Sequence, residues 1–239
     1  MIDLLAKRAY VACIRVVRTL LKPTGLLDRL EKSENRRARW FRSLFAIYDL
    51  DDMERLGVPW WTYDAIDAVS KFLIQNPGAR VFEWGSGAST LWLAKRSGEV
   101  ISAEFDANWH QNLAAKLQNA GHVTVKLTPA LETGEIASRK RGFEGQYFDD
   151  FVRAIRSAEG EFDVIVIDGR SREACLTEAV GRLKADGIIV FDDTKRQRYK
   201  DAISDCGLPF RRFDGLAVSL PISDSTTLIA RSEETLSAF

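Results

Sequence analysis

The sequence is poor in the residues from which disulfide frameworks, zinc sites and histidine relays are built. Its 239 residues include three cysteines and two histidines. Cys13, Cys175 and Cys206 are widely separated and lack metal-ligand spacing, so we expect reduced, unreactive thiols in a cytoplasmic protein. We assign structural roles to His110 and His122, because neither a zinc site nor a nucleophile relay can be assembled from them.

The sequence also lacks a long apolar run and an excess of charge of one sign. No stretch approaches the roughly eighteen uninterrupted apolar residues of a membrane-spanning helix, and no secretory cleavage pattern follows the N-terminus. The 34 basic and 34 acidic residues cancel, which gives no general reason to expect a nucleic-acid partner. A hydrophobic content of 46% is sufficient for one α/β domain with an appendage.

The most informative stretch is the run VFEWGSGAST, which occupies residues 81–90. It predicts a buried strand that turns through a glycine loop into a helix. We expect Gly85 and Gly87 to adopt backbone conformations closed to residues with a Cβ atom and to approach a ligand closely. The stretch therefore predicts a ligand-binding turn.

A second predicted strand, residues 100–104, follows that helix and ends in Glu104. In a parallel βαβ unit, an acid at this place holds the two hydroxyls of a ribose. A dinucleotide-binding fingerprint would need a glycine where Thr90 stands and an apolar residue where Glu83 stands. The site is thus predicted to bind a nucleoside, and a nicotinamide-dependent oxidoreductase is disfavoured.

An acid-x-Gly-x-Gly turn after the first strand, with an acid closing the second, resembles the class I S-adenosylmethionine-dependent methyltransferases. The resemblance covers residues 60–231 and implies a doubly wound, mostly parallel seven-stranded α/β sheet, the Rossmann-like methyltransferase fold. In that family the turn passes the methionine moiety, the second acid binds the ribose, and the segment after strand three meets the adenine. The segment before strand one often covers the cofactor. By position, the implied cofactor contacts are Trp61, Thr62, Glu83, Gly85, Ser86, Gly87, Ser89, Thr90, Glu104, residues 128–131 beginning with Thr128, and Asp168.

The rest of the domain alternates predicted strands and helices, as a doubly wound sheet requires. We expect residues 131–146 to form a solvated loop in preference to a phosphate-binding patch, with a lid over the active site as another interpretation. The predicted helices are the one capped by Thr62 and ended by residues 76–78, then 108–120, 147–157 and 173–184; the remaining strands are 123–127, 162–168, 187–193, and a hairpin of 210–214 and 226–230.

Carboxylates end several of these strands, at the edge of the sheet where such folds bind ligands. Asp168, followed by Asp192 and Asp193, is similar to the acids of catechol-type O-methyltransferases, which bind a divalent cation. That resemblance implies a Mg²⁺ ion held by the three aspartates. Without a metal, Asp168 or Asp192 is the candidate catalytic base, or the reaction depends on in-line placement. Five basic residues lie near the same edge, and we expect them to pair with exposed acids in preference to attracting an anionic acceptor: Arg170, Arg172, Lys195, Arg196 and Arg198.

Residues 1–58 are predicted to form a helical extension ahead of a methyltransferase domain at 59–239. Arg8, Arg15 and Lys22 recur every seven residues along an amphipathic first helix, and residues 1–42 hold eleven basic against four acidic residues. We expect the helix to pack on the domain or in a homodimer. Contact of residues 1–22 with the inner membrane surface is the alternative.

These observations together predict a cytoplasmic S-adenosylmethionine-dependent methyltransferase, which the first helix could attach peripherally to the inner membrane surface. The acceptor is expected to be an oxygen or nitrogen atom of a small or lipid-linked molecule. The alternative is a non-catalytic nucleoside-binding or scaffolding protein with the same fold, because a fold alone does not establish turnover.

Overall fold

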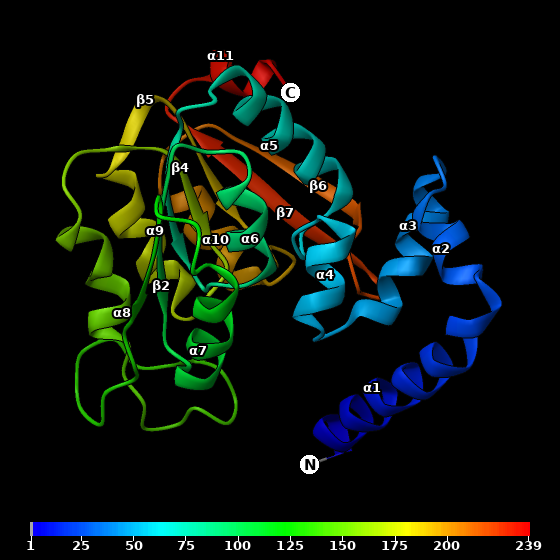
Figure 1. The fold of residues 1–239 in the computed structure, drawn as a ribbon. Coiled ribbons are helices and arrows are strands. Elements are labelled where there is room, and N and C mark those ends of the chain that lie inside the picture. Colours follow the sequence, from blue (N-terminus) through cyan, green and yellow to red (C-terminus); the bar gives the residue numbers. More distant parts are fainter. Residues whose placement is uncertain (1) are drawn as a thin grey trace.

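A computed structural model describes residues 2–239, with the backbone alone described over residues 2–8. Its centre is a seven-stranded sheet with the order β3-β2-β1-β4-β5-β7-β6 (Figure 1). The first five strands are parallel, and β7 pairs antiparallel with both β5 and β6. This confirms the predicted mostly parallel sheet with a terminal hairpin. The strands are β1 (Arg80–Trp84), β2 (Glu99–Glu104), β3 (Val123–Leu127), β4 (Phe162–Ile167), β5 (Leu183–Phe191), β6 (Phe210–Leu216) and β7 (Ser223–Ala230).

Helices cover both faces of this sheet and enclose two hydrophobic cores. Because successive strand residues point to opposite faces, Val81 belongs to one core and Phe82 to the other. One face carries α5 (Tyr63–Gln75), α6 (Ala88–Ala94), α7 (Ala107–Lys116) and α11 (Glu233–Ser237); the other carries α8 (Asp149–Arg153), the 3₁₀ turn η3 (Ala154–Ser157), α9 (Arg172–Val180) and α10 (Gln197–Asp205).

The boundaries of two predicted elements were wrong between β4 and β5. The predicted helix 173–184 ends at Val180, and β5 starts at Leu183, four residues before the predicted start. The register of β5 against β4 shifts after Phe162, and Gly187 lies at this irregularity. A Cβ atom on Gly187 would lie 2.9 Å from the Phe162 carbonyl oxygen. The sequence predicts Gly187 as the start of the strand, whereas in the structure it lies inside β5 and permits this close approach.

The N-terminal segments form a chain of short helices after one long helix. They are α1 (Ile2–Leu21), η1 (Lys22–Thr24), α2 (Leu26–Glu31), α3 (Arg36–Ser43), η2 (Leu44–Ala46) and α4 (Leu50–Leu56). The later part contacts the sheet domain, since the Trp40 indole donates to the Leu220 carbonyl at 2.9 Å and the Lys116 ammonium pairs with Glu54 at 2.8 Å. The division of the chain at residue 58 stays a prediction.

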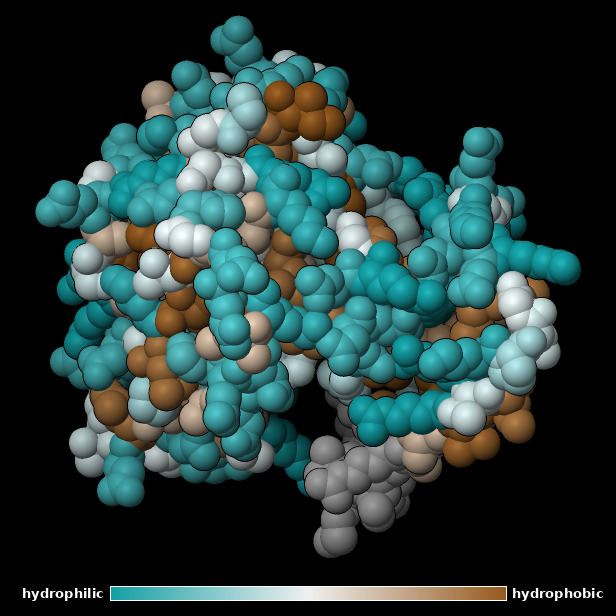
Figure 2. All heavy atoms as spheres, in the orientation of Figure 1, coloured by the Kyte–Doolittle hydropathy of each residue, from teal (hydrophilic) through white to brown (hydrophobic). Residues whose placement is uncertain are grey.

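Helix α1 extends away from the sheet instead of lying on it (Figure 1). Its Val16 and Leu20 are 61% and 68% exposed. Hydrophobic side chains are visible at the lower right of Figure 2, where this helix lies. The side chains of Lys7 and Arg8 lie outside the described ones. Within residues 2–239, no helix combines the length and apolarity needed to cross a bilayer. Membrane contact and a homodimer through this helix stay predictions.

A buried ion pair fixes the base of the extension. The Arg42 guanidinium is fully buried and donates to both carboxylate oxygens of Asp52, at 3.0 and 2.6 Å. Arg18, near the end of α1, lies 3.3 Å from the same carboxylate and also pairs with Asp49. One carboxylate on α4 therefore binds cations from α1 and α3.

Asp52→Ala should lower the free energy of unfolding by about 3–5 kcal/mol, because it leaves the buried Arg42 charge without its hydrogen-bonded partner and with only Glu31, 3.3 Å from its Nε. Urea denaturation measures this loss. The matched control is Asp28→Ala, which removes an exposed carboxylate 3.4 Å from Arg55 and should cost less than about 1 kcal/mol. Equal losses in the two variants would contradict the role assigned to Asp52.

Candidate functional site

A cavity of about 700 Å³ opens at the carboxyl ends of the parallel strands. The β1–α6 turn, the end of β2 and the segments after β4 and β5 converge on it, as the strand polarity requires. Among the residues that line it are Trp60, Gly85, Ser86, Gly87, Ser89, Glu104, Phe105, Trp109, Asp168, Arg170, Arg172, Asp192 and Asp193.

The turn after β1 is built around Gly85. Its φ of +93° is strained for residues with a side chain, and its N–H donates to the Ala103 carbonyl at 2.9 Å. A Cβ atom there would lie 2.7 Å from the Asp168 carbonyl oxygen. The expected backbone freedom is thus used at Gly85, but not at Gly87, whose φ of 167° is extended. A Cβ on Gly87 would instead touch the rings of Trp60 and Trp109 at 3.5 and 3.6 Å, so this glycine leaves space between them.

Glu83 lies behind the turn, fully buried and outside the cavity lining. Its Oε2 accepts from the hydroxyls of Thr90 and Ser102, and the Thr90 hydroxyl in turn accepts from the Gly87 N–H at 2.8 Å. Burial raises the pKa of Glu83 to about 7, and Oε1 has no hydrogen-bond partner. Glu83 and Thr90 therefore hold the turn in shape from outside the cavity lining, and their contact with a cofactor stays a prediction.

Glu104 ends β2 with its carboxylate held at the cavity wall. Its Oε1 accepts from the N–H groups of Phe105 and Asp106, both at 2.8 Å, and its Oε2 accepts from the Ser86 hydroxyl at 2.8 Å. Burial raises the pKa of Glu104, partly offset by these hydrogen bonds. A carboxylate has about four acceptor positions, so this one can still accept from a ligand hydroxyl.

Besides Glu83 and Thr90, three more of the expected contact residues, Trp61, Thr62 and Thr128, lie outside the cavity lining. Trp61 is fully buried and packs edge-on against Trp92, with ring centroids 5.8 Å apart. Thr62 begins α5 without a side-chain cap, and its N–H donates to the Thr226 hydroxyl at 3.1 Å. Thr128 donates its N–H to the backbone carbonyl of Glu104 at 2.7 Å.

Trp60 and Trp109 occupy the place that the sequence analysis gave to Trp61. Both line the cavity, and their ring centroids are 6.1 Å apart. The Trp109 indole donates to the Ser86 carbonyl at 2.6 Å, which ties α7 to the turn. Trp60 and Trp61, which are adjacent in the sequence, could not be told apart there, because no helical or strand period showed which of them faces the cavity. Trp109 could have been found from its place three residues after Asp106, the cap of the helix behind β2.

The three aspartates expected to bind Mg²⁺ lie along one side of the cavity, but they do not form a cation site. Arg172 bridges two of them, with an ion pair to the Asp168 carboxylate at 2.8 Å and a hydrogen bond to the Asp192 carbonyl. The Asp192 carboxylate accepts from Thr226, and Asp193 pairs with Arg196 at 2.7 Å. No group of three potential metal ligands occurs among the described residues. A guanidinium occupies the place where the cation was expected, and this donor set does not fit Mg²⁺.

The Asp168 carboxylate is one of several acids of the cavity whose pKa is raised. Burial, reinforced by the negative charge of Asp193, raises its pKa to about 6, and the Arg172 charge limits that rise. Burial and the charge of Asp168 also raise the pKa of Asp192. Asp168 can therefore exchange a proton near neutral pH, as a catalytic base must.

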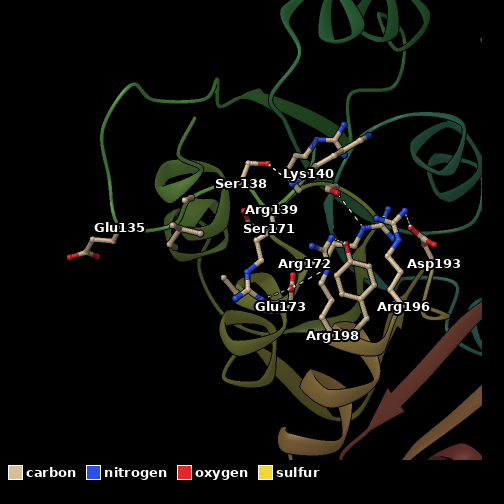
Figure 3. Close-up of a pocket in the computed structure, with 16 residues that line it drawn as sticks. Glu135, Ser138, Arg139, Lys140, Ser171, Arg172, Glu173, Asp193, Arg196 and Arg198 are labelled. Carbon is tan, nitrogen blue, oxygen red and sulfur yellow. Dashed lines mark hydrogen bonds and ion pairs between the residues drawn. The ribbon is translucent and has the colours of Figure 1, made fainter. Parts of the chain in front are cut away.

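A second cavity of about 430 Å³ adjoins the first and is shown in Figure 3. The two share Gly169, Arg170, Arg172, Asp193 and Arg196 in their linings. The outer wall of the second cavity is residues 135–140, part of the loop expected to be solvated. The Asp149 carboxylate accepts from the N–H groups of Glu135 and Ile136 and fixes this wall in place.

Comparison with known proteins shows the fold. No protein-family model matches this sequence, and no curated protein is detectably similar to it. An O-methyltransferase from Bacillus cereus, solved in complex with S-adenosylhomocysteine, superimposes with a TM-score of 0.55 at 15% identity, over 92% of this chain and 99% of that one. A methyltransferase-like protein from Silicibacter pomeroyi gives a TM-score of 0.47 at 21% identity, over 72% and 91% of the two chains. The first likeness confirms the predicted Rossmann-like methyltransferase fold.

Glu83→Gln should change how stability depends on pH. The pKa of Glu83 rises from an ordinary 4.5 to about 7 on folding, so folding favours the protonated form. The contribution of Glu83 to stability is fully favourable below pH 4.5 and is lost as the pH rises to about 7. Relative to the wild type, the variant should therefore gain about 3 kcal/mol between these limits, measured by urea denaturation across pH. Parallel pH profiles for the two proteins would contradict this assignment.

Proposed function

We propose that this protein transfers the sulfonium methyl group of S-adenosylmethionine to an oxygen or nitrogen atom of a small or lipid-linked acceptor. The observation that carries the proposal is the fixed Glu104 carboxylate beside the turn after β1, in which only glycine fits at position 85. This carboxylate lines a cavity of about 700 Å³, a volume in the range of small-molecule sites. The fold is one on which such enzymes are built.

The cavity offers each part of the cofactor a chemically suitable surface. Glu104 can accept a hydrogen bond from a ribose hydroxyl at its remaining acceptor position, because its carboxylate is already oriented by three donors. The ring of Phe105 provides an apolar wall for the adenine, and the gap that Gly87 leaves beside Trp60 and Trp109 has room for the amino-acid tail. When bound, the cofactor supplies an electrophilic methyl group.

The remaining task of the chain is to orient the acceptor and remove its proton. Asp168 lines the same cavity at the end of β4, with Arg172 holding its carboxylate. A carboxylate with a pKa of about 6 can accept a proton from the attacking hydroxyl or amine while it remains mostly ionised at neutral pH. Placement and proton transfer are thus both provided without a metal ion.

Glu104→Gln should weaken the binding of S-adenosylhomocysteine by about 10- to 100-fold, because the ribose hydroxyl loses its charged acceptor. Calorimetric titration measures the change, and a thermal shift with S-adenosylhomocysteine and S-adenosylmethionine, but not with NAD, should accompany it in the wild type. The control is Glu99→Gln at the other end of the same strand, where the carboxylate pairs with Arg80. Full-strength binding by Glu104→Gln would contradict the proposal.

Asp168→Asn should lower kcat by at least about 100-fold on any acceptor that the wild type methylates. In the wild type, kcat should fall as the pH drops below about 6, because protonated Asp168 cannot accept a proton. Product detection by mass spectrometry across a pH series checks both effects. Cofactor binding without any methylated product on a broad acceptor panel would favour the non-catalytic binding protein instead.

A further inference from the structure

The second cavity carries an excess of positive charge that its own acids do not balance (Figure 3). Six arginine and lysine residues line it, against three acidic residues. Two of the arginines have carboxylate partners: Arg172 pairs with Asp168, outside the lining, and Arg196 pairs with Asp193. One of the acids, Glu135, pairs with Arg153, which is outside the lining. Another, Glu173, is shared between the guanidinium groups of Arg198 and Arg139, at 3.5 and 3.6 Å. The lining therefore favours a bound anion.

Arg170 is the cation that most clearly lacks a partner. Its guanidinium is stacked over the rings of Phe105 and Phe143, with centroids 4.8 and 4.6 Å away. Its Nε is buried without a hydrogen bond, and among the side chains described, those of residues 9–239, no carboxylate lies within ion-pair distance of it. Burial and the neighbouring charge of Arg172 lower the pKa of Arg170. The rings hold a planar, half-buried cation in one orientation, with its donors unused.

The position of Arg170 relates this cationic surface to the proposed reaction. Arg170 lines both cavities, as do Arg172 and Asp193, so the two spaces meet at the rim that carries Asp168. Arg198, Arg139 and the loop that Asp149 fixes lie only on the second cavity. A molecule seated among these arginines would extend toward Asp168 and the cofactor cavity.

We propose that the second cavity binds a phosphate group of the methyl acceptor, which makes the substrate class a phosphate ester. The inference rests on the proposed function, because it treats this cavity as the acceptor side of that site. A phosphate carries nearly two negative charges and several acceptor oxygens, which match the paired N–H donors of arginine. The volume of about 430 Å³ suits one phosphate with a small attached group and not a polymer. The ester is either soluble or the headgroup of a lipid.

The test is a titration of the full chain, saturated with S-adenosylhomocysteine, with inorganic phosphate and with glycerol 3-phosphate. Arg170→Gln and Arg198→Gln should each weaken binding by at least about tenfold, which is about 1.4 kcal/mol. The matched control is Arg96→Gln, since Arg96 is also a half-buried arginine stacked on an aromatic ring, 4.4 Å above Trp92, but lines neither cavity. Its affinity for phosphate should stay within about twofold of the wild type.

A second arm identifies the source of the phosphate by sedimentation with phosphatidylcholine vesicles, with and without phosphatidic acid. Binding in either arm that both cavity variants weaken supports the proposal. Three outcomes overturn it: binding in neither arm, binding unaffected by both cavity substitutions, or acetate bound as tightly as phosphate.

Affinity for S-adenosylhomocysteine, measured separately, distinguishes this inference from the proposed function. Arg198→Gln should leave that affinity unchanged, because Arg198 lines the second cavity alone. A wild type that binds S-adenosylhomocysteine but not phosphate would overturn the proposed acceptor class and leave the methyltransferase proposal standing. A wild type that binds phosphate but not S-adenosylhomocysteine would overturn the methyltransferase proposal and leave an anion site.

Discussion

The close approach of Gly85 to the backbone after β4 is the constraint on which the cavity depends. A single added methyl group would collide with the Asp168 carbonyl, so the turn after β1 can pass this point only as glycine. The turn then places Ser86 against Glu104 at the end of β2. Three parallel strands thereby contribute to one ligand surface, and the sheet itself determines their order and polarity.

Two buried glutamates close to this turn have different roles because one lies beneath the turn and the other at the cavity wall. Glu83 is sealed beneath the turn, where two hydroxyls satisfy one oxygen and the other has no partner. Burial of Glu83, which raises its pKa, is unfavourable for the ionised carboxylate, but it places the carboxylate where it binds Thr90 and, through Thr90, the Gly87 N–H. Glu104 instead receives backbone donors from its own strand end, and its carboxylate remains available at the cavity wall.

The site as a whole is divided into an apolar half and a cationic half. Aromatic rings surround the space beside Glu104, whereas arginines surround the space beyond Asp168. Arg172 connects the halves, because it neutralises Asp168 and also bonds the backbone of β5 through the Asp192 carbonyl. This division fits a reaction in which one cavity binds a nucleoside by shape and hydrogen bonding and the other binds an anion by charge.

The sequence alone determined the order of the strands and helices along the chain, the glycine turn at Gly85 and the acid that ends β2, Glu104. These features depend on local periodicity and on backbone conformations that few residues allow. It did not determine which of Trp60 and Trp61 faces the cavity, where β5 begins, or that Arg172 lies among the aspartates. Those outcomes depend on contacts between segments far apart in the chain: Trp61 with Trp92, Gly187 with Phe162, and Arg172 with the ends of two strands. Local pattern carries no information about such distances, so only the packed tertiary structure decided them.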